Sequence, residues 1–465
     1  MPDQTTICAI STPAGQGGIA VIRISGPDAF AICDTVYRPM KKSYSVAEQF
    51  PNTISFGHII RQADIIDEVL VSVFRAPHSY TGEDTVEISC HGSIFIQQEI
   101  LKLLVEQGCK IAAPGEYTQR AYLNGKLDLS QAEAVGDLIA ASSAASHKIA
   151  VQQMRGGFSH RLSILRDQLL NFTSLVELEL DFSEEDVEFA DRTELRILAS
   201  EIETEIRRLT DSFAAGNAIK NGIPVAIIGA TNAGKSTLLN QLLKEDKAIV
   251  SDIHGTTRDV IEDTIIIDGL MFRFIDTAGI RETNDAIERI GIERTFRKIE
   301  QSSIVLWVID LTEEPDSTGS FAGMIIEKCR DRQLILVLNK SDRLEENELE
   351  KKLEYYRHFD KDCMVISAKS DTDIVLLETK LVASAHLPQI GENDIVVTNM
   401  RHYEALSRAL LAIEKVIRGL DDHIPGDLLA QDIRDCLYDL GTITGQQIHS
   451  EEVLQNIFKN FCIGK

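Results

Sequence analysis

The chain of 465 residues has no long apolar run and no closely spaced pair of cysteines. No stretch approaches the roughly 18 consecutive apolar residues of a transmembrane helix, and residues 1–6 lack the basic-then-apolar order of a secretory signal peptide. The eight cysteines are scattered without a CxxC pair, which argues against a zinc ribbon or a disulfide framework. Such usage is typical of a reducing compartment, so we expect a cytoplasmic protein without a membrane partner.

The chain is also poor in basic residues. Its 47 Lys and Arg stand against 72 Asp and Glu, which gives a formal net charge of −25. Because affinity for nucleic acid depends largely on neutralising phosphates, a nucleic-acid partner would need a local basic patch or a second protein. With 44% hydrophobic and 26% charged residues, the composition is that of a globular protein, and the length predicts about two to four domains.

The pattern of hydrophobic residues changes along the chain. Residues 6–115 contain short strand-like runs separated by Gly, Pro and His, typical of a β-rich or α+β unit. Residues 122–213 have helical periodicity. One buried helix face is expected from the apolar residues at three-four spacing, which are Leu162, Leu165, Leu169, Phe172, Leu175, Val176 and Leu180.

Residues 222–381 alternate strands with helices, which predicts a doubly wound α/β unit. The expected strands are PVAIIGA, DTIIIDG, FRFIDTAG, IVLWVIDL, LILVLNK and MVISAK. The chain is helical again from about Arg401 to Phe461, and the simplest arrangement packs the two helical zones together with the α/β unit inserted between them. The predicted domains are residues 1–121, 122–220, 221–384 and 385–465.

A phosphate-binding loop occupies residues 229–236, with the sequence GATNAGKS between a strand and the helical run STLLNQLL. Glycines in this pattern let backbone N–H groups turn toward phosphate oxygens. Lys235 would supply a positive charge to the outer phosphates, and the Ser236 hydroxyl would bind Mg²⁺.

Two further motifs fit the magnesium ion and the γ-phosphate. Asp276, in DTAG, follows a strand and could hold Mg²⁺ through water, while Gly279 offers its N–H to the γ-phosphate. Thr257, in GTTRD, could complete the magnesium shell. Ras-like enzymes orient the attacking water with a Gln after the DTAG turn; here Ile280 occupies that position, so another group must hold the water, or the protein is a slow switch that needs an external activator.

Two more motifs fit guanine. Asp342, in NKSD, would accept hydrogen bonds from N1–H and the exocyclic amine of guanine; adenine presents an acceptor at N1 and would leave the carboxylate unpaired. Residues 367–369, SAK, end the last strand and could contact the guanine oxygen through the backbone. Five motifs in this order, each at a strand end, predict a protein that binds and hydrolyses GTP.

Stretches both within and outside these motifs resemble the MnmE (TrmE) family of tRNA-modification GTPases, and the resemblance covers the full length. It is carried by TPAGQGGIAVIRISG, YTGEDTVEISCHG, PGEYTQRAYLNGKLDLSQAEA, SDIHGTTRD…DTAGIRE…IERIGIER and FCIGK. The implied fold is α+β multidomain: a β-rich N-terminal folate-binding and dimerising domain, a discontinuous α-helical domain, and an inserted doubly wound α/β Ras-like G domain.

The resemblance also implies an activity and partners. A homodimer would work with the FAD-dependent flavoprotein MnmG in a heterotetramer, which would install an aminomethyl or carboxymethylaminomethyl group at C5 of the wobble uridine of certain tRNAs. The one-carbon donor would be a methylene-tetrahydrofolate. The acidic composition fits a division in which the partner supplies most of the tRNA contact.

Several residue roles follow from the resemblance alone. Folate contacts fall on Arg23, Glu87, Lys126 and Lys465. A potassium ion would be held by Asn232, Ser251 and Thr256 and by the backbone of Ile253, and Glu288 would orient the attacking water. Gly464 would permit an unusual backbone angle, so that the tail reaches the folate site of the N-terminal domain, within the chain or across a dimer interface.

The expected ligands are GTP or GDP, Mg²⁺, K⁺ and a tetrahydrofolate derivative, in the 5-formyl or methylene form. The expected nucleotide contacts are Asn232, Ala233, Gly234, Lys235, Ser236, Thr237, Ser251, Asp252, Ile253, His254, Gly255, Thr256, Thr257, Asp276, Thr277, Ala278, Gly279, Asn339, Lys340, Asp342, Ser367, Ala368 and Lys369. An alternative is a ribosome-assembly GTPase switch with the same G domain. Such proteins usually carry basic RNA-binding appendages, so the acidic chain favours the modification enzyme.

Overall fold

The computed structural model divides the chain into two compact units, each described here by itself. The first comprises Met1–Ala140, Ala150–Arg207 and Glu404–Lys465; the second comprises Ala141–Ile149 and Arg208–Tyr403. The structure describes residues 5–40, 45–181, 192–243, 263–275, 295–314, 316–359, 362–385, 394–446, 461 and 464, with the backbone alone at 175–181, 192, 316–321 and 427.

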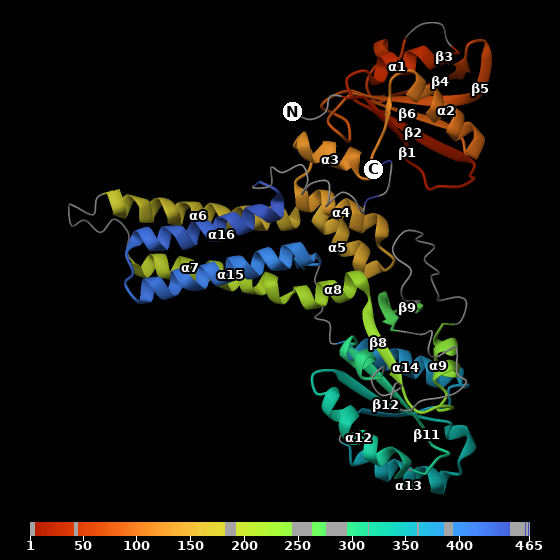
Figure 1. Cartoon of the computed structure of the whole chain (residues 1–465), viewed down its shortest axis with the longest axis vertical. Coiled ribbons are helices and arrows are strands. Elements are labelled where there is room, and N and C mark those ends of the chain that lie inside the picture. The colour runs from red at the N-terminus through yellow and green to blue at the C-terminus, as the bar shows by residue number, and fades with distance from the viewer. Residues whose placement is uncertain are drawn as a thin grey trace. The chain divides into compact units, whose positions relative to one another are not determined.

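The amino-terminal part of the first unit is a mainly antiparallel sheet (Figure 1). Its strands, in spatial order, are β3 (Tyr37–Pro39), β4 (Thr53–Arg61), β5 (Asp64–Phe74), β6 (Thr85–His91), β2 (Ile19–Ser25), β1 (Ile7–Ile10) and β7 (Lys110–Ile111). The β1–β7 pair is parallel. The sequence indicated β1, β2, β5 and β6, but not β4, whose first half alternates half-buried with exposed residues and whose second half contains the only two buried residues of the strand.

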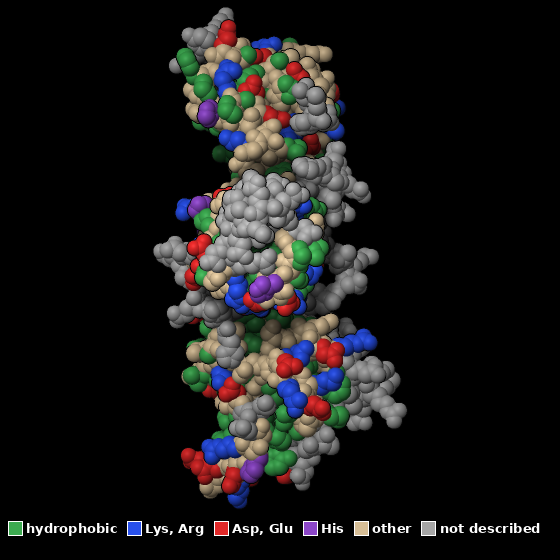
Figure 2. Space-filling view, turned by 90° about the vertical axis from the view of Figure 1, so that its left-hand side faces the viewer, with side chains coloured by type: hydrophobic (Ala, Val, Ile, Leu, Met, Phe, Trp, Pro, Cys, Tyr) green, Lys and Arg blue, Asp and Glu red, His purple; other side chains and the backbone are tan. Residues whose placement is uncertain are grey.

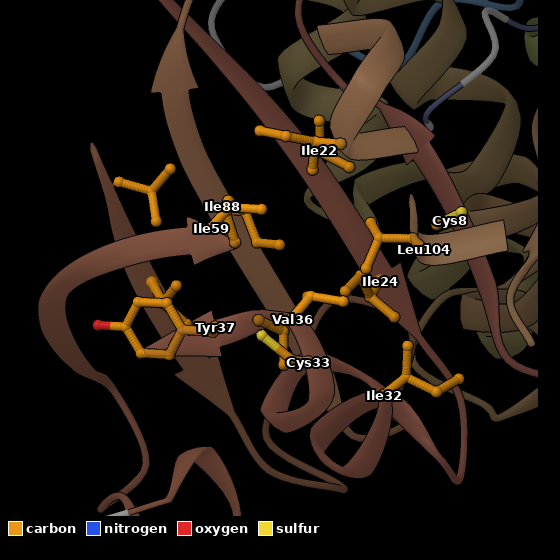
Figure 3. Packing of buried hydrophobic residues seen from close by; sticks show 14 of the residues in the cluster. Cys8, Ile22, Ile24, Ile32, Cys33, Val36, Tyr37, Ile59, Ile88 and Leu104 are labelled. Atoms are coloured by element: carbon orange, nitrogen blue, oxygen red, sulfur yellow. The ribbon is translucent and has the colours of Figure 1, made fainter. Parts of the chain in front are cut away.

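Helices α1 (Ala29–Val36) and α2 (Ile94–Glu106) cover one face of this sheet, and the 3₁₀ turn η1 (Val46–Glu48) lies beside α1. Alternate strand residues point to this face and are fully buried, among them Ile22, Ile59 and Ile88 (Figure 3). Cys33 from α1 and Leu104 from α2 pack against them. The intervening strand residues, which include Arg23, therefore lie on the opposite face.

The rest of the first unit is helical, and two helices extend into it from the second unit. The helices are α3 (Glu116–Leu123), α4 (Leu129–Ala140), α5 (Ala144–Met154), α6 (Gly157–Asp181), α7 (Arg192–Asp211), α15 (Met400–Asp421) and α16 (Gly426–Thr444). The predicted buried face of α6 is confirmed for Leu162, Leu165, Leu169 and Phe172; Leu175, Val176 and Leu180 lie outside the described side chains.

The two helical zones pack together, as the sequence analysis expected. Helix α6 lies along α16, although more than 240 residues separate them in the chain (Figure 1). Salt bridges join α7 to α15, between Arg207 and Glu414 and between Arg196 and Asp421. None of the described helices is long and apolar enough to cross a membrane.

The second unit contains a doubly wound sheet in the order β13-β12-β11-β8-β10-β9, in which only β9 is antiparallel to its neighbour. The strands are β8 (Ile223–Ile228), β9 (Asp263–Ile267), β10 (Leu270–Phe274), β11 (Ile304–Asp310), β12 (Gln333–Asn339) and β13 (Asp362–Val365). All six expected strands are therefore confirmed.

Helices line both faces of this sheet. They are α8 (Phe213–Asn221), α9 (Lys235–Leu242), α12 (Asp316–Lys328), α13 (Glu346–Arg357) and α14 (Asp371–Ser384), with the 3₁₀ turn η3 (Ser341–Arg343) after β12. Successive residues of β8 pack in different hydrophobic cores, one on each face of the sheet. Val225 packs in the core formed with α9 and α14, and Ala226 packs in the core formed with α12 and α13. Burial on both faces explains the continuous apolar runs of β8, β11 and β12.

Candidate functional site

The three nucleotide motifs that the structure describes meet at one edge of the second unit's sheet. Because β8, β11, β12 and β13 are parallel, their carboxyl ends lie at the same edge. Residues 229–236 follow β8, Asn339 ends β12, and residues 367–369 come just after β13. Ligands of open α/β sheets bind at this edge, where the strand order reverses.

The backbone of residues 229–236 depends on its glycines. Gly229 has φ +146° and Gly234 has φ +102°, both in the region that favours glycine. A Cβ at Gly229 would lie 2.2 Å from the Val308 carbonyl oxygen, and one at Gly234 would lie 2.1 Å from Asn339 Nδ2. Asn232 also has a positive φ, +68°, which asparagine tolerates better than most residues. The loop therefore packs directly on its neighbours and leads into the N-terminus of α9, where anions bind.

Asn339 joins two of the motifs. Its Nδ2 donates to the Ala233 carbonyl at 2.8 Å, and its Oδ1 accepts from the Ala368 N–H at 2.9 Å. The side chain is buried, with the residue only 2% exposed. Sequence reasoning assigned Asn339 to the nucleotide; the structure shows that it also holds the phosphate-binding loop against the 367–369 loop.

Lys235 folds back over its own loop. Its Nζ donates to the carbonyl oxygens of Gly229 at 2.8 Å and Ala230 at 2.6 Å. Burial lowers the pKa of this ammonium, and the nearby charge of Lys298 lowers it further. A bound phosphate would offset both effects and raise the pKa of Lys235, because its negative charge favours the charged ammonium. Ser236 lies half-buried and Thr237 exposed in the first turn of α9.

On the guanine side, Lys340 has a left-handed backbone, with φ +67°, and pairs with Asp310 at the end of β11. Burial works against the charge of Asp310, yet hydrogen bonds from Lys340 and from the hydroxyl and N–H of Thr312 hold its pKa below the ordinary value. Sequence reasoning missed Asp310. Its signal was an acidic residue that ends the otherwise apolar strand IVLWVID.

Asp342 is exposed on η3. Discrimination between guanine and adenine is strong only for a buried carboxylate, so a bound guanine base would itself have to cover Asp342. Ser367 is buried, and its N–H donates to Asp373 Oδ2 at 2.7 Å. The N–H of Lys369 donates to the Ser367 hydroxyl at 3.4 Å. The 367–369 loop is thus ordered by its own hydrogen bonds.

In the first unit, the structure brings Arg23 and Glu87 together as cross-strand partners of β2 and β6. Nε and Nη2 of Arg23 contact the same oxygen, Oε1 of Glu87, at 2.9 and 2.8 Å. The guanidinium carbon lies 5.4 Å from the ring centre of Tyr80 and 5.5 Å from that of Tyr117. The pair lies on the face of the sheet opposite α1 and α2.

Of the two other predicted folate contacts, Lys126 is described, and it lies beside the loop between β5 and β6. Lys126 Nζ donates to the Pro77 carbonyl at 3.0 Å. Lys465 lies outside the described residues, but Gly464 is described, and its carbonyl accepts from the Ser11 hydroxyl at 3.0 Å. Gly464 has φ +93°, and a Cβ there would lie 2.2 Å from the Ile10 carbonyl oxygen. The tail thus reaches the N-terminal sheet of its own chain.

Two family models match the chain. The model described as "GTP-binding protein TrmE N-terminus" covers residues 6–126, and "MnmE helical domain" covers residues 129–462. "tRNA modification GTPase MnmE" of Bacteroides thetaiotaomicron is 59% identical over 466 residues, with all of both chains covered. The protein of the same name from Flavobacterium johnsoniae is 52% identical over 468 residues, again with full coverage of both. The chain belongs to the MnmE (TrmE) family.

Among solved structures, the MnmE-family chain is similar to Era of Aquifex aeolicus bound to GDP·AlF₄⁻. The two are 29% identical, with 41% of this chain and 66% of that one covered, at a TM-score of 0.27. Overlap this low adds nothing to the site geometry. The family assignment rests on the two models and on the full-length relatives.

Several residues with predicted roles in this MnmE-family chain lie outside the described part, so their placement stays a prediction. They are Ser251, Asp252, Ile253, His254, Gly255, Thr256, Thr257, Asp276, Thr277, Ala278, Gly279, Glu288 and Lys465. Within the described residues, no cluster of His, Cys, Asp and Glu could by itself hold a metal ion. Of the expected metal ligands, Asn232 and Ser236 are described.

Sequence reasoning missed the residues that surround Arg23. Tyr80 and Glu83 lie in the segment YTGED, and Tyr117 and Arg120 in EYTQRAYL, stretches that carried the family resemblance but received no individual role. Arg120 is almost buried and binds both oxygens of Glu83, at 3.1 and 3.2 Å. No local sequence pattern predicts the contacts between Arg23 and these tyrosines or between Arg120 and Glu83, because the paired residues are distant in sequence.

Proposed function

We propose that this member of the MnmE family hydrolyses GTP and, with a FAD-dependent flavoprotein partner, modifies C5 of the wobble uridine (U34) of certain tRNAs. The observation that carries the proposal is full-length membership of a family of tRNA-modification GTPases, and the geometry of the three described nucleotide motifs supports it. The product would be the aminomethyl or carboxymethylaminomethyl uridine. A cytoplasmic location belongs to the proposal.

The phosphate half of the nucleotide site fits GTP and Mg²⁺. Gly229 and Gly234, with positive φ, let the loop turn into the N-terminus of α9. Lys235 can exchange its carbonyl partners for phosphate oxygens. Ser236 and Thr257 would hold Mg²⁺, with Asp276 acting through water. The ion would neutralise charge on the β- and γ-phosphates.

For hydrolysis, we assign the water-orienting role to Glu288, because the family resemblance places it there. Ile280, at the position where Ras-like enzymes have Gln, has no group that could orient water. Asn232, Ser251, Thr256 and the backbone of Ile253 would hold K⁺, which can supply the positive charge that an arginine finger supplies elsewhere. Faster GTP turnover in K⁺ than in Na⁺, abolished by Asn232→Ala, is expected. Equal turnover of the native protein in both salts would contradict the potassium assignment.

The Arg23–Glu87 pair supports a folate site. A carboxylate can pair with the amino-pyrimidinone edge of a pteridine, and cations such as Lys126 and Lys465 suit its glutamate tail. Both contacts of Arg23 use Oε1 of Glu87, so Oε2 is not engaged by Arg23 and could pair with the pteridine. Methylene-tetrahydrofolate bound there would supply the one-carbon unit.

Surface features support the partners. Ile19, Ile54 and Leu70 are 70%, 66% and 45% exposed on the face of the N-terminal sheet opposite its core, which favours a homodimer through this face. On the face shown in Figure 2, described Lys and Arg side chains are interspersed with Asp and Glu. This distribution and the net charge of −25 favour tRNA contact mainly through the flavoprotein MnmG in a heterotetramer.

The domain boundaries remain part of the proposal. Residues 1–121 would form the folate-binding and dimerising domain, 122–220 and 385–465 the discontinuous helical domain, and 221–384 the G domain. The two compact units divide the chain differently, because residues 141–149, 208–220 and 385–403 belong to the same unit as residues 221–384.

Nucleoside mass spectrometry of tRNA from a strain that lacks the protein tests the function. We expect loss of the C5 modification at the wobble uridine, restored by the native gene. An unchanged wobble uridine would contradict the proposal. An abnormal profile of ribosomal subunits in that same strain would favour the ribosome-assembly alternative.

A further inference from the structure

The Arg23–Glu87 pair has a geometry that needs support. A fork-to-fork arginine–carboxylate pair uses two oxygens and resists rotation. Here Nε and Nη2 share Oε1 of Glu87, so the guanidinium could pivot about that single oxygen. The rings of Tyr80 and Tyr117 lie at 5.4 and 5.5 Å from its carbon, within the range of a cation–π contact. The rings restrict the pivot that the ion pair allows.

The two rings are held differently. Tyr117, on α3, is fully buried, and its hydroxyl donates to the carbonyl of Arg23 itself at 2.7 Å. Tyr80 belongs to the loop between β5 and β6, and its hydroxyl pairs with the buried Thr118 hydroxyl at 2.8 Å. Tyr117 is therefore part of the domain core, whereas the position of Tyr80 depends on how its loop is held.

An ion pair latches that loop to α3 and β2. Glu83 accepts from Arg120 Nη1 with both oxygens, at 3.1 and 3.2 Å, and from the Ser25 hydroxyl at 2.7 Å. Arg120 also binds Glu116 at 2.9 Å, and its side chain is only 7% exposed. Asn124 adds a second attachment, since its Nδ2 donates to the Thr81 carbonyl at 2.8 Å.

We propose that Tyr80 is a positioning residue of the one-carbon site, which holds the Arg23 guanidinium in line with Glu87, and that the Arg120–Glu83 latch sets the position of Tyr80. The inference rests on the proposed folate function. Tyr80 would act on the ligand through Arg23, and Arg120 of α3 would hold the loop between β5 and β6 through Glu83. Removing the ring should weaken the ligand without unfolding the domain.

The test is calorimetric titration of the full-length protein with 5-formyl-tetrahydrofolate. Tyr80→Leu removes the ring and should weaken binding about 3- to 30-fold, the size of one cation–π contact. Tyr80→Phe keeps the ring and should restore most of that affinity. Arg120→Gln should weaken binding in the same direction, since it releases the loop.

Matched controls separate positioning from general stability. Tyr37→Phe removes another hydroxyl in the same domain, bonded to Ser55 at 2.9 Å, and Arg61→Gln breaks a comparable ion pair with Glu99. Both should leave the affinity for 5-formyl-tetrahydrofolate unchanged. Melting temperatures of all variants show whether each is folded at the titration temperature.

A double-mutant cycle decides the mechanism. If Tyr80 acts through Arg23, Tyr80→Leu should have no further effect in an Arg23→Ala background. Undiminished binding by Tyr80→Leu, or effects of the two substitutions that simply add, would overturn the inference alone. Absence of 5-formyl-tetrahydrofolate binding by the native protein would overturn the folate function, and the inference with it.

Discussion

The two candidate sites lie on two kinds of sheet. The nucleotide site lies at the edge of a parallel sheet, where strand ends bring together loops that are each continuous in sequence. The N-terminal site lies on the face of a mainly antiparallel sheet, where Arg23 and Glu87 meet across strands although 64 residues separate them. The residues of the first site come from motifs that are continuous in sequence. Those of the second are distant in sequence and are brought together by the register of the strands.

The same difference decides what each site tolerates. The nucleotide edge depends on backbone conformation, since Gly229 and Gly234 have positive φ and no room for a side chain. The N-terminal site depends on side-chain pairs, in which Arg23, Glu87 and Tyr80 can be exchanged one at a time, whereas Tyr117 belongs to the domain core. Substitutions should therefore separate the two sites cleanly.

Deletion of Gly464 and Lys465 should separate the two activities most completely. Chain ends are normally tolerant of truncation, but here Gly464 contacts Ser11 and Ile10 on the N-terminal sheet. We expect the truncated protein to bind 5-formyl-tetrahydrofolate weakly and to lose tRNA modification. GTP hydrolysis should remain nearly intact, because the second unit is unchanged. Titration, phosphate release and nucleoside mass spectrometry measure the three properties.

A point substitution controls for loss of the carboxyl terminus as such. Gly464→Ala keeps the length but places a Cβ 2.2 Å from the Ile10 carbonyl oxygen. It should reproduce part of the loss of folate affinity. Full folate affinity in the truncated protein would show that Lys465 is an ordinary surface charge.

Asp342→Asn should change the nucleotide site alone. The carboxylate would pair with N1–H and the amine of guanine, so its loss should weaken GTP binding by about 2–5 kcal/mol, the cost of breaking one charge-assisted pair in an interface. Preference should shift toward the xanthosine nucleotide, which offers an acceptor where guanosine has the amine. Calorimetry with both nucleotides measures this, and an unaltered GTP affinity would refute the guanine role.

These contrasts explain what the sequence could and could not reveal. All six strands of the doubly wound sheet were predictable, and β8, β11 and β12 most directly, because burial on both faces makes these three continuous apolar runs. Strand β4 was not, since residues of its first half, such as Ile54 and Phe56, are apolar yet exposed.

The same holds for single site residues. The phosphate-binding loop could be read from eight consecutive letters. The role of Asp310 and the Tyr80–Arg23 contact could not be predicted from the sequence. Each depends on a partner that is distant in the chain and lies beside it only in the folded structure. The family resemblance named Arg23 and Glu87 but could not show that they contact each other.

Gly234→Ala tests whether the nucleotide edge depends on backbone shape. The substitution forces an alanine to φ +102° with its Cβ 2.1 Å from the buried Asn339 amide. We expect the free energy of unfolding to fall by about 2–4 kcal/mol, from left-handed strain and the disturbed Asn339 hydrogen bonds. Denaturant unfolding followed by circular dichroism measures the change.

Gly323→Ala is the matched control in the same unit. Gly323 is exposed within α12, and a Cβ there would meet nothing within 4 Å. Alanine should be neutral or should stabilise the helix by up to about 1 kcal/mol. Equal effects of the two substitutions would mean that the conformation at Gly234 carries no special strain.

Asp310→Asn should have the smallest effect, and that effect should depend on pH. The pKa of Asp310 is lower in the folded protein than its ordinary value, so its contribution to stability is present above the unfolded value of about 3.9 and is lost as pH falls through the folded value. At pH 7 the substitution leaves Lys340 without its carboxylate and should cost about 1–3 kcal/mol of unfolding free energy. The difference from the native protein should begin to shrink as pH falls below about 4, and it should vanish below the lowered folded pKa, where the native carboxyl group also becomes neutral. Denaturant unfolding at a series of pH values measures this, and a difference that stays constant from pH 7 to acid would show that the charge of Asp310 does not stabilise the nucleotide edge.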